Sequence, residues 1–178
     1  MRIAFIGVPC SGKSTMAREI AKAIGGSYIP ETARVLIEAM GRRPTKEDQR
    51  FIMLMQSHLE NSMMGEHKVS DVPIFLNHIY YRLYWGDDEN SKELLEIAKK
   101  HRYDMIFKLS PLPYKDDSVR YQNKEEIKKV DDMIDEYEAD FGLYTYIHAT
   151  DLRERVKTVL EDIRYHENLL SVPIQPRK

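Results

Sequence analysis

One short segment constrains this chain more than any other. Residues 7–14 read GVPCSGKS and match the pattern G-x-x-x-x-G-K-[ST] in full. The apolar run at residues 3–8 leads into this segment and is typical of a strand buried on both faces of a parallel sheet. Apolar residues at helical spacing follow at Ala17, Ile20, Ala21 and Ile24. Because the pattern lies between a buried strand and an amphipathic helix, it predicts an anion-binding loop in an α/β protein.

Each fixed position of the pattern has a physical role. Gly7 and Gly12 permit backbone angles and a close approach that a side chain would block, so backbone N–H groups can surround a phosphate. Lys13 is expected to bridge the β- and γ-phosphates, and the Ser14 hydroxyl to ligate Mg²⁺. Cys10 lies inside the loop, where a small tolerated residue is a simpler interpretation than a redox-active or nucleophilic thiol. The residues expected to bind ATP with Mg²⁺ are Gly7, Pro9, Cys10, Ser11, Gly12, Lys13, Ser14 and Thr15.

The rest of the chain alternates between strand-like and helix-like patterns. Parallel neighbours need crossover connections, which place helices on both faces of a sheet, so the alternation predicts one three-layer α/β domain with a five-stranded parallel sheet. Further strands are expected near residues 28–30, 68–71, 103–109 and 143–149. Further helices are expected near residues 35–40, 45–65, 79–84, 91–100, 127–141 and 152–163.

The domain is expected to span residues 1–171. Residues 172–178 then form a short tail that contains two prolines. Residues 110–124 combine turn residues and prolines with mixed charge, so we expect an exposed, mobile lid at about residues 111–124.

Composition narrows the classes of partner. The chain has 178 residues, enough for one core without disulfides, and its 27 Lys and Arg against 29 Asp and Glu give a formal charge of −2. No general basic surface is therefore expected for non-specific binding of nucleic acid or acidic lipid. A single cysteine and the lack of a signal or membrane-spanning segment favour a reducing, cytoplasmic location.

A local basic group is formed by Arg42, Arg43, Lys46 and Arg50.

Two acidic residues follow predicted strands, at the edge where ligands bind in parallel α/β folds. Asp71 closes the third strand and is expected to hold Mg²⁺ or its water shell, the alternative being an ordinary turn residue. Glu31 follows the second strand and is expected to accept a proton from a substrate hydroxyl, or else to act only as a favourable charge at a helix start. Arg34 lies one turn beyond Glu31, where it binds the acceptor or pairs with Glu31. The sequence leaves open which carboxylate is the base.

Positive charge and aromatic rings complete the candidate site. Phosphoryl transfer needs cations near the transferring oxygens, and among the lid residues Lys115, Arg120 and Lys124 the best candidate is Arg120. A solvated loop charge is the alternative for Arg120. An aromatic run follows the third strand, where a flat acceptor such as a nucleobase could stack on rings that the core does not need. This run contains His78, Tyr80, Tyr81, Tyr84 and Trp85.

With these motifs the chain resembles the small P-loop kinases, most closely the single-domain group that includes nicotinamide riboside kinases and related nucleoside or nucleotide kinases. The resemblance rests on residues 7–15, on residues 30–34 (PETAR), on Asp71 and on the lid-like residues 117–120. It implies the P-loop NTPase fold, with a sheet in the order 2-3-1-4-5 and an adenine site near residues 150–153. It also implies catalytic roles for Lys13, Glu31, Asp71 and Arg120.

The activity implied is ATP- and Mg²⁺-dependent transfer of the γ-phosphoryl group to a hydroxyl or phosphate of a nucleoside- or nucleotide-like small molecule, with the oligomeric state left open. In one departure, Val72 replaces the arginine that many relatives have after the acidic residue of the third strand. The alternatives are a kinase acting on a modified base or an end of DNA or RNA, and a regulatory ATPase. A guanine-specific switch is disfavoured, because residues 123–126 read NKEE and do not end in the required Asp.

Overall fold

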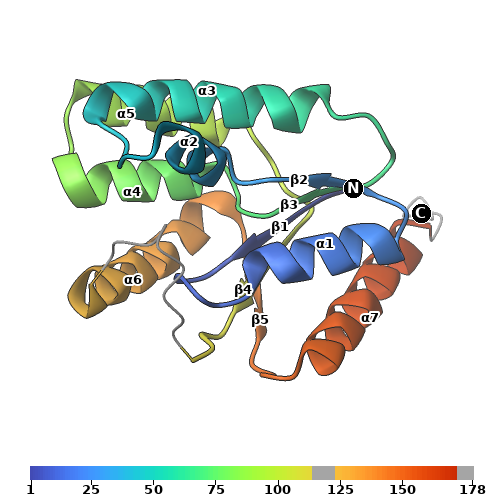
Figure 1. The fold of residues 1–178 in the computed structure, drawn as a ribbon. Helices are drawn as coiled ribbons and strands as arrows, with labels where there is room; N and C mark the ends of the chain where they lie inside the picture. Colours follow the sequence, from blue (N-terminus) through green and yellow to red (C-terminus); the bar gives the residue numbers. More distant parts are fainter. Residues whose placement is uncertain (114–122, 172–178) are drawn as a thin grey trace, which may run out of the picture.

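The computed structural model describes residues 1–113 and 123–171, and its centre is a parallel sheet of five strands (Figure 1). The strands follow the order β2-β3-β1-β4-β5, which confirms the expected fold class and strand order. They are β1 (Arg2–Ile6), β2 (Ser27–Ile29), β3 (Lys68–Ser70), β4 (Met105–Leu109) and β5 (Tyr144–Ile147). The expected tail at residues 172–178 and most of the expected lid, with Lys115 and Arg120, lie outside the described residues.

The central position of β1 follows from its composition. Its side chains are apolar on both faces, and Ile3, Ala4, Phe5 and Ile6 are fully buried. All four strand pairs are parallel, so the carboxyl ends of the strands meet at one edge of the sheet. The loops after β1, β2 and β3 therefore lie next to one another at this edge.

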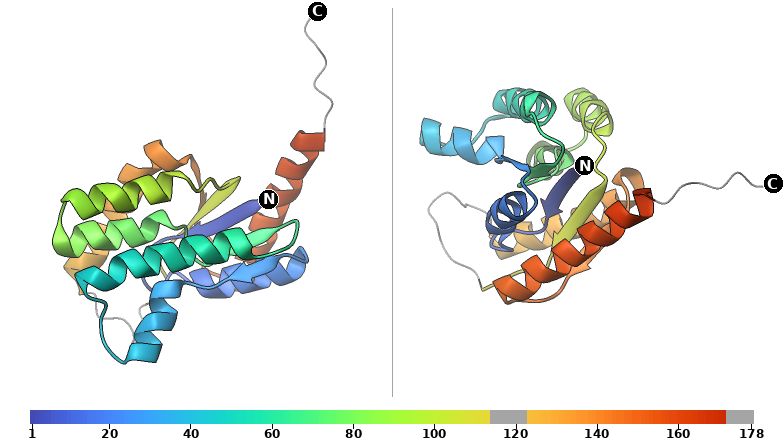
Figure 2. Two further views of the ribbon diagram at one scale, coloured as in Figure 1. Left: turned by 90° about the horizontal axis from the view of Figure 1, so that it is seen from above. Right: turned by 90° about the vertical axis from the view of Figure 1, so that its right-hand side faces the viewer.

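Helices cover both faces of the sheet (Figures 1 and 2). Helices α1 and α7 pack on one face, α3 to α6 form the layer on the other, and α2 lies beside α3 near the end of β2. The bounds are α1 (Lys13–Ala23), α2 (Thr32–Met40), α3 (Lys46–Ser62), α4 (Phe75–Trp85), α5 (Glu89–Lys99), α6 (Lys124–Phe141) and α7 (Leu152–Ser171). Within the described residues, no helix combines the length and the apolar character needed to cross a membrane.

Two helix starts show how local sequence sets the bounds. The spacing of Thr45 and Asp48 predicts a capping box, and helix α3 does begin after Thr45 with this box formed. Helix α6 begins at Lys124, three residues before the predicted start, because Asn123 and Glu126 form a second capping box. The last residue of the expected lid therefore belongs to α6.

Helix α2 differs from the sequence-based expectation in its packing. The apolar stripe at residues 35–40 predicts a helix closed by Gly41, and α2 does end there, with Gly41 in the left-handed region. The stripe is nevertheless not part of the core, since Val35 is 50% exposed and the only buried residue of α2 is Thr32. This short helix lies beyond the edge of the sheet, so most of its apolar side chains have no core to enter.

Candidate active site

The loop between β1 and α1 requires glycine at two positions. Gly7 has a φ of 147° and Gly12 a φ of 88°, which L side chains rarely adopt. A Cβ atom at Gly7 would lie 2.8 Å from the Leu109 carbonyl oxygen and 2.9 Å from the Ser11 Oγ. The loop can therefore lie directly against the end of β4 only with glycine at position 7. Both glycines have the structural role that the sequence predicts.

Lys13 lies over this loop. Its Nζ donates to the carbonyl oxygens of Gly7 at 3.0 Å and Val8 at 3.1 Å. Since Lys13 is the first residue of α1, its charge adds to the positive end of the helix dipole. Cys10, within the loop, has a φ of 66°, and its carbonyl oxygen accepts a hydrogen bond from the Leu112 N–H at 3.3 Å. The loop is thus tied to the segment that follows β4.

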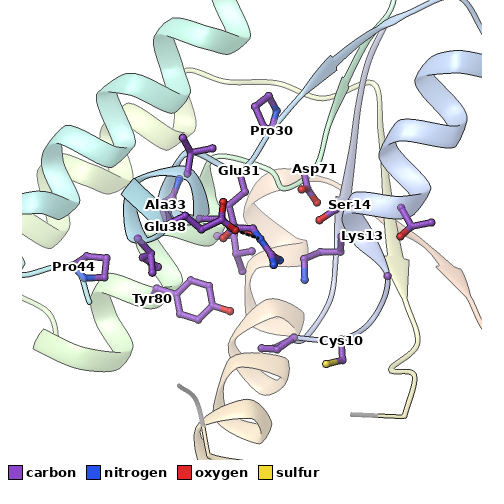
Figure 3. A pocket seen from close by; sticks show the side chains of 18 of the residues that line it. Cys10, Lys13, Ser14, Pro30, Glu31, Ala33, Glu38, Pro44, Asp71 and Tyr80 are labelled. Atoms are coloured by element: carbon purple, nitrogen blue, oxygen red, sulfur yellow. Dashed lines mark hydrogen bonds and ion pairs between the residues drawn. The ribbon is translucent and has the colours of Figure 1, made fainter. Parts of the chain in front are cut away.

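The loop opens into a cavity of about 490 Å³ (Figure 3). Its walls come from the loop and α1, the end of β2 with α2, the start of α3, and the end of β3 with α4. Figure 3 shows Asp71, Ser14 and Lys13 at one end of the view, and Tyr80 and Pro44 at the other. The sequence-predicted residues that line this cavity are Pro9, Cys10, Gly12, Lys13, Ser14, Thr15, Glu31, Arg34 and Asp71.

Asp71 is buried at the end of β3. Its N–H continues the ladder between β2 and β3 by donating to the Ile29 carbonyl oxygen at 2.9 Å. Its carboxylate Oδ2 accepts a hydrogen bond from the Tyr28 hydroxyl at 3.1 Å, whereas its Oδ1 is buried with no partner among the described residues. Burial and the nearby carboxylate charge raise the pKa of Tyr28 to about 12, so this phenol remains a donor at neutral pH.

The surroundings of Asp71 fit a Mg²⁺ ion that arrives with a nucleotide. Mg²⁺ usually keeps several waters and binds one or two protein oxygens together with phosphate oxygens. The unpartnered Oδ1 of Asp71 is such an oxygen, and the Ser14 hydroxyl points toward the same part of the cavity (Figure 3). Ser14 and Asp71 are therefore the residues that could hold the metal.

Glu31 precedes α2, and buried hydrogen bonds fix the start of that helix. The N–H and the hydroxyl of Thr32 both donate to Gln56 Oε1, at 2.9 Å and 2.8 Å. Gln56 in turn donates to Glu60 at 3.3 Å, and Glu60 accepts from the Tyr103 hydroxyl at 2.8 Å. Glu31 therefore has a firmly held backbone and a side chain that lines the cavity.

The part of the cavity beyond Glu31 suits a flat, polar molecule. Arg34 Nε donates to Glu38 Oε1 at 3.1 Å, which places an ion pair on the α2 wall. Asn77 on α4 is 4% exposed, and its Nδ2 has no partner among the described residues. Tyr80 follows on the same helix and also lines the cavity (Figure 3). A free amide donor near an aromatic ring can bind the edge and the face of a planar ligand.

Comparison with known proteins assigns the chain to a family. Residues 2–155 match the family described as AAA domain. The chain belongs to this family. No curated protein matches the sequence.

Solved structures show which fold this AAA-domain protein has. A deoxyadenosine kinase from M. mycoides, with products dCMP and a flexible dCDP bound, aligns with a TM-score of 0.67 at 14% identity, over 93% of this chain and 99% of that chain. NadR in complex with NR aligns with a TM-score of 0.76 at 19% identity, over 99% of this chain and 53% of that chain. NadR in complex with NAD and AMP-PNP gives a TM-score of 0.75 at 16% identity, with 51% of that chain covered. The chain thus spans about half of NadR, and the shared fold is that of the small P-loop kinases.

The local basic group near α3 is not a free cationic surface. Arg42, Lys46 and Arg50 form ion pairs with carboxylates on α3, at the start of α5 or on α5, so their charge is locally balanced. Such pairing weakens the support that this group gives to a nucleic-acid substrate. The pairs are Arg42–Asp48 at 2.5 Å, Lys46–Asp88 at 2.6 Å and Arg50–Glu93 at 2.8 Å.

Sequence reasoning missed three residues of the AAA-domain site. Tyr28 and Asn77 belong to no motif and are identified only because the fold places both in the cavity that Asp71 lines. The third is Arg155 in the first turn of α7, which contacts the phosphate loop from behind. Its spacing to Val159, four residues later, places an arginine on the buried stripe of α7, and this was the available signal. Val72, which follows Asp71, is fully buried and does not line the cavity.

Proposed function

We propose that this AAA-domain protein is a kinase that transfers the γ-phosphoryl group of ATP, with Mg²⁺, to a hydroxyl or phosphate of a nucleoside-like small molecule. The observation that carries the proposal is that the phosphate loop, two carboxylates and a separate acceptor wall line one cavity. Its volume of about 490 Å³ is in the range of small-molecule sites. The fold shared with a deoxyadenosine kinase and with NadR in complex with NR supports a nucleoside-like acceptor.

The donor side binds the triphosphate. Backbone N–H groups of the loop and the N-terminus of α1 surround the phosphates, and Lys13 exchanges the Gly7 and Val8 carbonyl oxygens for phosphate oxygens. Only a flexible side chain has to move for this exchange. Ser14 and Asp71 would hold Mg²⁺, which neutralises charge on the β- and γ-phosphates when bound.

In this proposal Glu31 is the base and Asp71 holds the metal. Asp71 is buried against β2 and bonded to Tyr28, whereas Glu31 opens α2 on the acceptor side of the cavity. The acceptor hydroxyl gives its proton to the Glu31 carboxylate while its oxygen forms a bond to the γ-phosphorus. The bond between the γ-phosphorus and the β–γ bridging oxygen breaks, and its electron pair remains on ADP.

The acceptor side selects the molecule that receives the phosphoryl group. Asn77 Nδ2 would donate to a carbonyl oxygen or ring nitrogen of the acceptor, and Tyr80 would contact its flat face. Arg34, held by Glu38, would orient the sugar or a phosphate on it. Arg120, which lies outside the described residues, remains our candidate for a lid cation that approaches the transferring oxygens.

The test is a transfer assay with free acceptors. The protein is incubated with γ-labelled ATP, Mg²⁺ and single nucleosides or nucleoside monophosphates, and the products are separated and identified by mass spectrometry. We expect label in at least one acceptor, with an equal amount of ADP. The Lys13→Ala variant and chelation of Mg²⁺ should abolish the transfer.

Two outcomes would contradict the proposal. Label found only as free phosphate, at a rate independent of the added nucleoside, would indicate an ATPase without an acceptor. Transfer restricted to oligonucleotides, with none to free nucleosides or nucleotides, would indicate a kinase of nucleic acid.

A further inference from the structure

The guanidinium of Arg155 is buried behind the phosphate loop, and none of the described residues gives it an acidic partner. Its side chain is 1% exposed, and it forms no ion pair within the part of the chain that the structure describes. Burial lowers the pKa of Arg155, and no charged group among residues 1–113 and 123–171 acts in the opposite direction. An uncompensated buried charge destabilises a fold, so its position beside an anion site needs an explanation.

The hydrogen bonds of Arg155 join three loops at the carboxyl edge of the sheet. Its Nη1 donates to the Ser11 carbonyl oxygen of the phosphate loop at 2.6 Å. Its Nη2 donates to the Ser110 carbonyl oxygen after β4 at 2.8 Å, and its Nε to the Ala149 carbonyl oxygen after β5 at 2.5 Å. One side chain thus holds together the loop that binds phosphate and two loops beside it.

The bond to Ser11 sets the direction of one peptide group in the phosphate loop. In a planar trans peptide the C=O and the following N–H point in opposite directions. Because the Ser11 C=O points at Arg155, the Gly12 N–H points away from it. A Cβ atom at Gly12 would lie 3.4 Å from Arg155 Nη1, so the guanidinium is in close contact with this peptide.

We propose that Arg155 is a positioning residue for the donor nucleotide: it aims the Gly12 N–H at the bound phosphates, and their negative charge balances its own. The inference rests on the proposed function in one respect, namely that the loop binds ATP. If Arg155 only packed the loops together, its contribution to nucleotide binding would be the same for every nucleotide. In the proposed role, that contribution grows with the number of phosphates on the ligand.

The experiment compares ATP, ADP and AMP. Their dissociation constants are measured by displacement of a fluorescent ATP analogue, with Mg²⁺ and without any acceptor, for the native protein and for Arg155→Met. The methionine has a similar length but neither charge nor donors. Arg164→Met, at an exposed position of α7, is the matched control. We expect Arg155→Met to weaken ATP and ADP about tenfold or more and AMP less than about twofold, with no change for Arg164→Met.

The alternative results are distinct. Equal weakening of all three nucleotides, or no weakening, would show that Arg155 only packs the loops together. If the native protein binds no ATP, the proposed function itself fails. If the native protein and Arg155→Met bind ATP equally, the proposed function stands and only this inference is overturned.

A second variant covers the case in which Arg155→Met does not fold. Arg155→Lys keeps a positive charge whose pKa burial lowers, whereas the guanidinium stays charged throughout the accessible pH range. Other titratable groups near the loop, such as His148, are present in both proteins. Their effects therefore cancel in the ratio of the two dissociation constants. The ratio of the ATP dissociation constants, Arg155→Lys over native, should rise severalfold from about pH 6 to about pH 9, as the amine loses its proton. A ratio independent of pH would overturn the proposed role of the charge.

Discussion

The two sides of the cavity to which we assign the donor and the acceptor are constructed in opposite ways. On the donor side the backbone forms the site, with two glycines at positive φ and a peptide group held from behind by Arg155. On the acceptor side, side chains from α2, α3 and α4 form the walls, and one of these helices has a single buried residue.

This difference explains what each side reveals in the sequence. A site made of backbone groups accepts only glycine at certain positions, so it leaves a readable motif. A wall made of side chains can be assembled from many residue types, so it leaves none. The same fold can therefore keep one donor and change its acceptor, and the following predictions test how independent the two sides are.

The largest effect is expected for Lys13→Ala. Loss of this cation should lower kcat about a thousandfold for every acceptor, because it removes charge stabilisation of the transferring phosphoryl group. Steady-state kinetics measures kcat, and calorimetry measures acceptor binding, which should not change. Lys22→Ala, at an exposed position of the same helix, is the control. Weaker acceptor binding in Lys13→Ala would show that the two sides are not independent.

Glu31→Gln should lower kcat about a hundredfold while ATP affinity stays at its native value, because the amide cannot accept the acceptor proton. By contrast, Asp71→Asn should raise the Mg²⁺ concentration needed for half-maximal activity. Rates measured over a Mg²⁺ titration separate the two roles, with Glu96→Gln on the surface of α5 as the control. The opposite assignment of base and metal holder would hold if Glu31→Gln shifted the Mg²⁺ dependence instead.

A fall in pH should destabilise the helices on the acceptor side before those on the donor side. His78 on α4 is bonded to the Tyr137 hydroxyl at 2.6 Å and to Ser91 Oγ at 2.9 Å, and burial lowers its pKa to about 4. Its stabilising effect is complete above the unfolded pKa of about 6.5 and is lost as pH falls toward 4. At about pH 5 we expect a loss of about 2 kcal/mol, seen by hydrogen exchange as faster opening of α4 to α6. Simultaneous opening of α1 would contradict this order.

The smallest effect is expected at Asn77. Asn77→Ala should raise the KM of the acceptor about tenfold and leave the KM of ATP unchanged, because one hydrogen bond to the acceptor is lost. Initial-rate measurements with each substrate varied in turn provide both constants. Asn90→Ala, on an exposed part of α5, serves as the control. An equal rise in the KM of ATP would indicate that Asn77 shapes the whole cavity rather than the acceptor wall.

The sequence predicted those parts of the structure that only a few residue types can form. The buried run of β1, the glycines at 7 and 12 and the capping box at Thr45 each have one ready structural solution, and each prediction is confirmed. The strand order came from the family resemblance, because periodicity alone does not say which strands are neighbours.

The parts that could not be predicted depend on tertiary contacts. The spacing of Leu152, Val156 and Val159 predicts a buried stripe on α7, yet Leu152 is 41% exposed and Arg155 is buried in line with Val159. A pattern that treats arginine as polar cannot recognise a guanidinium satisfied by three carbonyl groups. Likewise the spacing of the apolar residues of α2 is typical of a helix that faces the core, yet some of them line the cavity. Which residues pack against such a face depends on the fold and cannot be inferred from the spacing.

The bond from Arg155 to Ser11 joins positions 144 residues apart. During synthesis the complete motif leaves the ribosome long before the helix that holds it in place. A partly synthesised chain therefore contains the whole phosphate-binding motif, while its loop still lacks the hydrogen bond from Arg155. The phosphate loop therefore reaches its final form only after α7, which follows it in the chain, has been made.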